Sequence, residues 1–281
     1  MVSEDDEPAS RGSAWVSAAG HSLHASVRGA GDPVILLHGL FGMGSNLGGI
    51  ARVLAETYEV HQIDLPNHGR SGWIDDMSLA DMAEQVLIYV QEYQLAPAAF
   101  VGHSLGGKVA MQVAMLDASA VSSLVIADIA PIEYPSSHDA VFAGIGVVER
   151  SKPKSRQEAA SWLEAHITEP SVVQFLLLSL KKEGDAYVWR FNEQVIRDHY
   201  EELRDVPRGS PFAGPALFIS GALSEYWPPH AREETIQRFP AADFHSIEGT
   251  GHWLHAEKPD EFNEVVSAFL HGQSDRSVDT P

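Results

Sequence analysis

The feature that most constrains the fold is a serine between two glycines, in the frame Gly102-x-Ser104-x-Gly106. The apolar run before the frame predicts a buried strand, and the run after it predicts a helix. A sharp strand-to-helix turn leaves no room for a Cβ at either glycine and projects the serine hydroxyl clear of the backbone. The following helix directs its positive end and the N–H of Leu105 toward charge that develops beside the serine. We therefore expect Ser104 to be a nucleophile for acyl transfer.

A second backbone donor is expected upstream of this turn. The serine frame alone recurs by chance in chains of this length, so its context has to decide. A short apolar run, typical of a buried parallel strand, ends at His38-Gly39 and continues into Leu40 and Phe41. The amide of Leu40, or alternatively that of Phe41, is expected to pair with the Leu105 amide in an oxyanion hole. The competing interpretation is a glycine-rich turn without a catalytic role.

The general base is expected at His252. This histidine lies in a glycine-flanked loop after a strand-like run, residues 242–247, and before a helix that begins near Pro259. A loop in that position can carry the imidazole back over the sheet to Ser104. His255 is the nearest competitor, and packing of the loop against the last helix is the expected role for it.

The acidic partner of this histidine is ambiguous in the sequence. The usual position is the turn after the strand-like run 216–220, where the chain has Ser224 and then Glu225. A serine cannot offset the charge of an imidazolium. The alternative lies one strand earlier, where the apolar run 123–127 ends at Asp128 beside the strand of the nucleophile. We assign the acid to Asp128 and keep Glu225 as the alternative.

Strand-like runs alternate with helical stretches and predict an α/β fold, with a mostly parallel central sheet and helices on both faces. An N-terminal hairpin is expected from residues 14–18 and 21–28. Between residues 132 and 214 the pattern becomes helical. The helices expected there are 139–149, 155–167, 171–180 and 192–203, with a strand-like piece at 186–191. We interpret residues 132–214 as an inserted helical cap on a core of residues 1–131 and 215–281.

Two aromatic residues are candidates for the substrate pocket. Phe41 and Trp253 are close in sequence to the expected oxyanion donor and to the expected base. Apolar residues of the cap, in particular residues 175–178, either line the same pocket or form the core of the cap itself.

Composition narrows the classes of partner. The chain has 39 Asp and Glu against 19 Lys and Arg, a formal net charge of −20, which disfavours binding to nucleic acid or to anionic membranes. It has no cysteine, which excludes disulfides, thiolate metal sites and a cysteine nucleophile. No signal-like segment or apolar run long enough to span a bilayer is present, so we expect a cytoplasmic protein without a membrane anchor, as a monomer or homodimer. No metal or cofactor motif is present.

The motifs together resemble the α/β-hydrolase superfamily, and within it the small bacterial serine esterases of the YbfF type. The resemblance is carried by residues 38–42, 64–71, 102–110, 128–131 and 251–259. Its most specific parts are Asn67-His68-Gly69-x-Ser71 and the Gly-Gly-Lys that follows Leu105. In that group the acid follows the sixth strand, which agrees with the assignment of Asp128.

The resemblance implies an α/β-hydrolase fold and a serine carboxylesterase that acts on short- to medium-chain acyl esters through an acyl-enzyme. The implied substrate is a small-molecule ester, and no cofactor is required. A thioesterase, a carbon–carbon bond hydrolase or a cofactor-free perhydrolase would keep the same three residues. A non-catalytic binding protein of this fold is a further alternative.

Overall fold

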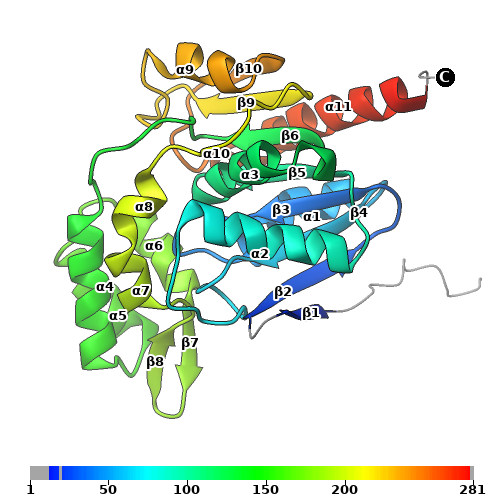
Figure 1. Ribbon diagram of the computed structural model, residues 1–281. Coiled ribbons are helices and arrows are strands. Elements are labelled where there is room, and N and C mark those ends of the chain that lie inside the picture. Colours follow the sequence, from blue (N-terminus) through cyan, green and yellow to red (C-terminus); the bar gives the residue numbers. More distant parts are fainter. Residues whose placement is uncertain (1–12, 19–20, 279–281) are drawn as a thin grey trace, which may run out of the picture.

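The computed structural model describes residues 13–18 and 21–278 of the chain. An eight-stranded sheet forms its centre, and the order across the sheet is β1 (Ser13–Ala18), β2 (His21–Arg28), β4 (Glu59–Asp64), β3 (Pro33–Leu37), β5 (Ala98–His103), β6 (Val121–Ala127), β9 (Ala216–Gly221) and β10 (Ala242–Ile247). β1 and β2 form the expected antiparallel hairpin, whose turn lies outside the described residues, and β2 pairs antiparallel with β4. The remaining pairs are parallel (Figure 1).

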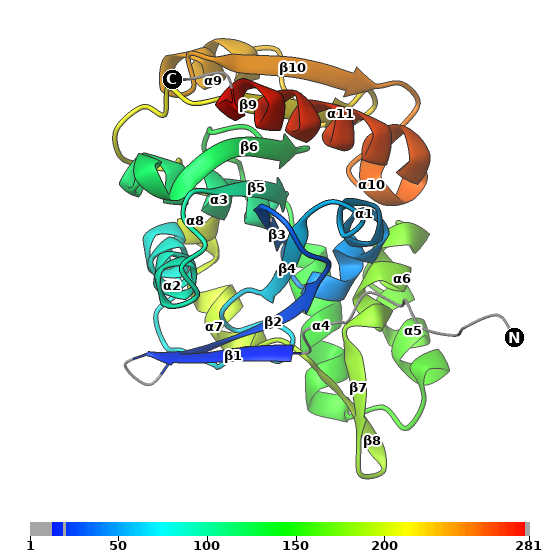
Figure 2. The same cartoon turned by 90° about the vertical axis from the view of Figure 1, so that its right-hand side faces the viewer.

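Helices cover both faces of the sheet, as the sequence predicts. One face carries α1 (Gly48–Leu54), α10 (Leu254–Glu257) and α11 (Pro259–Val278), and the other carries α2 (Leu79–Glu92) and α3 (Leu105–Leu116) (Figure 2). Alternation along β3 explains both layers, because Val34 packs into the cluster of α1 and α11, and Ile35 into that of α2 and α3. The short helices η1 (Gly44–Leu47) and η2 (Ala118–Ala120) and the helix α9 (Ala231–Arg238) complete the connections.

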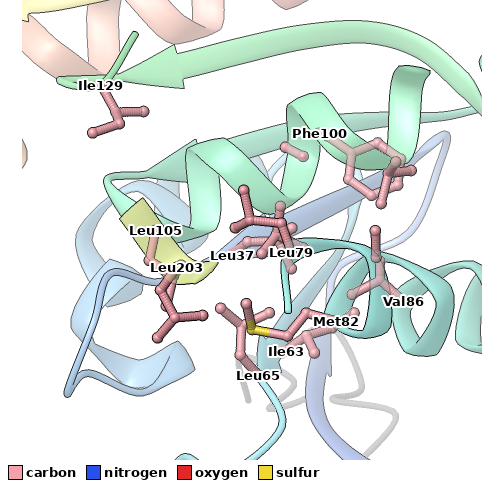
Figure 3. Packing of buried hydrophobic residues seen from close by; sticks show 14 of the residues in the cluster. Leu37, Ile63, Leu65, Leu79, Met82, Val86, Phe100, Leu105, Ile129 and Leu203 are labelled. Atoms are coloured by element: carbon pink, nitrogen blue, oxygen red, sulfur yellow. The ribbon is translucent and has the colours of Figure 1, made fainter. Parts of the chain in front are cut away.

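Packing under α2 shows how the core holds these elements in place. Ser78 caps α2, since its hydroxyl accepts the N–H of Asp81, whose carboxylate accepts the N–H of Ser78 in return. Met82 and Val86 lie four residues apart on the inner face of the helix. There they pack in one cluster with side chains of the sheet, including Leu37 of β3 and Ile63 of β4 (Figure 3). Full burial of each such side chain stabilises the fold by about 1.5–3 kcal/mol.

The segment between β6 and β9 is mostly helical. It contains α4 (Asp139–Ser151), α5 (Arg156–Glu164), α6 (Pro170–Leu178), the antiparallel pair β7 (Leu180–Glu183) and β8 (Ala186–Trp189), α7 (Glu193–Asp198) and α8 (Tyr200–Arg204). The single helix expected at 192–203 is wrong. The chain leaves helical geometry at His199 (φ −101°, ψ 12°), whose Nε2–H donates to the carbonyl of Asp75 at 2.9 Å.

The ends of the parallel strands bring the candidate residues to one edge. β3, β5 and β6 run parallel, and they end immediately before His38, Ser104 and Asp128, while His252 lies in the loop after β10. The carboxyl edge of a parallel sheet is the usual place for a ligand site in an α/β fold.

Candidate active site

Ser104 occupies the strained turn that its two glycines predict. Its backbone has φ 53° and ψ −119°, a conformation that residues with a side chain rarely adopt. A Cβ on Gly102 would lie 2.3 Å from the carbonyl oxygen of Gly106, and a Cβ on Gly106 would lie 2.2 Å from that of Leu37. Neither glycine can therefore be replaced without moving the backbone. The Ser104 N–H donates to the carbonyl of Ala127 at 3.0 Å, which holds the turn against the next strand.

Three predicted residues meet in one hydrogen-bond chain. His252 Nε2 lies 3.1 Å from Ser104 Oγ, and His252 Nδ1 lies 2.7 Å from Asp128 Oδ2. The carboxylate can only accept, so Nδ1 carries the proton and Nε2 is free to accept the serine proton. This is the geometry in which an imidazole acts as general base toward a hydroxyl.

Asp128 is fully buried, and both oxygens of its carboxylate accept hydrogen bonds. Oδ1 accepts the N–H of Gly221 at 2.9 Å, and Oδ2 accepts the Ser224 hydroxyl in addition to the His252 proton. Hydrogen bonds from neutral donors compensate a buried charge in part, and a protonated imidazole would complete that compensation. Glu225 is exposed, and the bonds to His252 in the described structure do not include it. The serine at the usual acid position thus supports the aspartate from the neighbouring strand.

The loop after β3 lies against Ser104. A Cβ on Gly39 would be only 3.3 Å from the Cβ of Ser104, so this glycine permits the close approach. The N–H of Phe41 donates to His68 Nε2 at 3.1 Å and is therefore engaged. The N–H groups of Leu40 and Leu105 have no protein acceptor in the described part of the chain. Of the two upstream amides, that of Phe41 is engaged and that of Leu40 has no acceptor among the described residues.

Two buried histidines, His38 and His103, hold backbone groups of these loops. His103 precedes the nucleophile, and its Nε2–H donates to the backbone carbonyl of His252 at 2.8 Å. His38 Nδ1–H donates to the Gly39 carbonyl at 2.8 Å. Burial lowers the pKa of His103 well below its ordinary value and lowers the pKa of His38 to about 4. Both histidines lie inside the motif segments, which was the signal available in the sequence, but the partner of His103 lies 149 residues away along the chain.

A cavity of about 470 Å³ opens on the hydroxyl of Ser104. Phe41 and Trp253, the two expected pocket residues, both line it, as do Phe175 and Leu176 from α6. Leu178 of the same predicted stretch is 59 % exposed and points away from it. The cavity is apolar over most of its wall, which suits the hydrocarbon part of a small substrate.

His252 also has an aromatic neighbour that the sequence did not indicate. The ring of Tyr226 stacks on the imidazole of His252 with a centroid distance of 4.0 Å and an interplanar angle of 22°. Tyr226 lines the cavity too, and its ring covers one face of the His252 imidazole.

Two further features of the described residues concern metal binding and membrane spanning. Within residues 13–18 and 21–278, no cluster of three or more His, Asp or Glu side chains has the arrangement of a metal site. Over the same residues, no helix has both the length and the apolar composition needed to cross a membrane.

Comparison with known proteins shows to which family this chain belongs. Residues 34–265 match the model of the alpha/beta hydrolase family. The chain is 38 % identical to the esterase YbfF of Escherichia coli over 85 % of this chain and 93 % of that protein. It is 32 % identical to the sn-1-specific diacylglycerol lipase ABHD11 of Mus musculus, over 84 % and 80 % of the two chains. A solved marine microorganism esterase, 35 % identical, superposes with a TM-score of 0.84 over 88 % of this chain and 98 % of its own. The match over most of the chain, the sheet order and the strained serine turn agree, and the chain belongs to the alpha/beta hydrolase family.

Proposed function

We propose that this protein is a serine carboxylesterase that cleaves small acyl esters through an acyl-enzyme on Ser104. The observation that carries the proposal is the continuous chain of hydrogen bonds from Ser104 through His252 to buried Asp128. Relatives named as esterases, at 35–38 % identity, support the same reaction class.

The first half-reaction forms the acyl-enzyme. His252 Nε2 takes the proton of Ser104 while Oγ bonds to the ester carbonyl carbon. The carbonyl oxygen becomes an oxyanion between the amides of Leu40 and Leu105, each donor contributing about 3 kcal/mol to transition-state stabilisation. The bond from carbon to the alcohol oxygen then breaks, and protonated His252 gives its proton to the leaving alkoxide. Asp128 stabilises the imidazolium between these steps.

The second half-reaction restores the enzyme. Water loses a proton to His252 Nε2 and adds to the acyl carbon, the same two amides bind the oxyanion, and the bond from carbon to Ser104 Oγ breaks as the proton returns to the serine. The products are one carboxylic acid and one alcohol. These steps use only side chains and amides of this chain.

The substrate class follows from the cavity. The cavity that Ser104 lines is also lined by apolar side chains, including Val172, Phe175 and Leu176, and has a volume of about 470 Å³. A cavity of this size and polarity favours short- to medium-chain acyl groups of uncharged esters. We include residues 132–214, as a cap over the core of residues 1–131 and 215–281, in this proposal, because α6 supplies part of the wall. A cytoplasmic location and a monomeric or homodimeric state remain part of it as well.

The test is hydrolysis of p-nitrophenyl esters from acetate to palmitate. Wild type is expected to be most active on the shorter members, and Ser104→Ala to lose about 10⁴-fold or more in kcat. Ser161→Ala, an exposed serine on α5, is the matched control and should match wild type. Activity that persists in Ser104→Ala would contradict the proposal. Parallel assays with acyl thioesters and with a carbon–carbon hydrolase substrate test the alternatives, and binding without turnover in every assay would favour a non-catalytic role.

A further inference from the structure

Hydrogen bonds hold the peptide groups on both sides of Leu40. The Gly39 carbonyl accepts His38 Nδ1–H at 2.8 Å and the N–H of Gly42 at 3.0 Å. In a trans peptide the carbonyl and the next N–H point in opposite directions. Fixing the Gly39 carbonyl therefore fixes the direction of the Leu40 N–H, the amide left free beside Ser104.

The next residue, Phe41, is held at both of its backbone polar groups. Its N–H donates to His68 Nε2 at 3.1 Å, and its carbonyl accepts the Ser179 hydroxyl at 2.6 Å. Both partner side chains are fully buried, so water does not compete for these bonds. Phe41 itself has φ 62°, a strained conformation that persists only where the surroundings impose it. Both bonds engage the Phe41 backbone in this conformation.

His68 can make its bond to Phe41 in only one form. Its Nδ1 lies 2.9 Å from the carbonyl of Pro66, which can only accept, so Nδ1 carries the proton and Nε2 is an acceptor for the Phe41 N–H. A cationic imidazole would turn a hydrogen atom toward that N–H. Burial lowers the pKa of His68 to about 3, which keeps the neutral form throughout the neutral range.

We propose that His68, together with Ser179, is a positioning residue of the oxyanion hole: the two side chains clamp Phe41 and thereby aim the Leu40 N–H at the oxyanion. The inference rests on the proposed function. It also gives a role to the Asn-His-Gly segment, which the triad leaves unexplained. Ser179 lies between α6 and β7, and the N–H of Asn192 donates to the Asn67 carbonyl at 2.9 Å. These bonds connect residues 38–42 and the segment around His68 to the mostly helical segment between β6 and β9.

A pair of substitutions separates the clamp from a general effect on folding. His68→Asn keeps an amide near Nδ1 for the Pro66 carbonyl but has no acceptor for the Phe41 N–H, whereas the longer amide of His68→Gln can present its oxygen near Nε2. We expect His68→Asn to lose about 10- to 100-fold in kcat with KM little changed, less than removal of a donor costs. His68→Gln should recover most of that loss. His61→Asn, at a buried histidine bonded to Tyr89 away from the site, controls for destabilisation alone.

A second readout reports on the oxyanion directly. A trifluoromethyl ketone adds to the serine and places an oxyanion in the hole, so its inhibition constant should rise in His68→Asn by the factor by which kcat/KM falls. Equal activities of the Asn and Gln variants, or wild-type activity in His68→Asn, would overturn the inference. If His68→Asn does not fold, Ser179→Ala decides, since it should lower kcat at constant KM, and unchanged kcat there also overturns it. An inactive wild type would refute the proposed function together with the inference, whereas an active wild type with an equally active His68→Asn refutes the inference alone.

Discussion

Replacing Asp128 by asparagine changes one atom and is expected to disable the base. Asp128 Oδ2 accepts both the proton of His252 Nδ1, at 2.7 Å, and the Ser224 hydroxyl, while Oδ1 accepts the N–H of Gly221 at 2.9 Å. The Gly221 N–H can only donate, so the asparagine oxygen must remain at Oδ1 and its NH₂ group must take the place of Oδ2.

This NH₂ group reverses the histidine tautomer. It donates to His252 Nδ1, so the ring proton moves to Nε2 and points at Ser104, where an acceptor is needed. In a serine hydrolase of another fold the same change lowers kcat by about 10⁴-fold, equivalent to about 5.4 kcal/mol at 1.36 kcal/mol per factor of ten. We expect a loss of that order here with KM little changed.

The assay is steady-state hydrolysis of p-nitrophenyl butyrate by wild type, Asp128→Asn and Glu225→Gln. Glu225 is exposed at the edge of the cavity and its substitution should change kcat by less than about threefold, since no charge is removed from the hydrogen-bond chain. A variant Asp128→Asn that keeps more than a tenth of wild-type kcat, with a large loss in Glu225→Gln, would refute this reasoning and move the acid to the later turn.

Other consequences concern the supports of the site. Gly106→Ala places a Cβ 2.2 Å from the Leu37 carbonyl oxygen and should destabilise the fold by about 1–3 kcal/mol and lower kcat; unchanged thermal denaturation would contradict this. The free energy of unfolding should fall as pH is lowered from 6.5 toward 4, because burial lowers the pKa of His38 and of His255 to about 4 and the unfolded chain takes up the protons first. Urea titrations should show a shallower fall in His255→Leu than in wild type, and parallel curves would count against it. Lys108 Nζ donates to three backbone carbonyls at 2.9, 2.5 and 2.6 Å. Lys108→Met should therefore lower the free energy of unfolding by about 2 kcal/mol. A variant as stable to urea as wild type would show that these bonds do not stabilise the fold.

The strands of the core could be predicted because local sequence determines them. The runs 33–37 and 242–247 coincide with β3 and β10, since each is bounded by residues that favour turns. The segment between β6 and β9 was harder. Only Ser179 separates α6 from β7, and β7 contains Lys181 and Lys182, so no periodicity distinguishes the strand from the helix. The break at His199 depends on a bond to the Asp75 carbonyl, 124 residues away, which no local pattern encodes.

The same distinction applies to the site. Ser104 and Asp128 directly follow predictable strands and His252 lies in the loop after another, so the sequence could nominate each of them. Which of the Leu40 and Phe41 amides is left without an acceptor could not be predicted locally, because the Phe41 N–H bonds to His68, 27 residues farther along the chain. Likewise, the support of Asp128 by Ser224 depends on the pairing of β6 with β9 rather than on either segment alone.

The most direct measurement is the identity of the residue that becomes acylated or phosphonylated. The protein is treated with a fluorophosphonate, digested and mapped by mass spectrometry, with Ser104→Ala treated in parallel. The proposed mechanism predicts a single adduct on Ser104, absent from Ser104→Ala and suppressed by prior incubation with an ester substrate. An unlabelled wild type, or an adduct on another serine that persists in Ser104→Ala, would contradict the claim that Ser104 is the nucleophile.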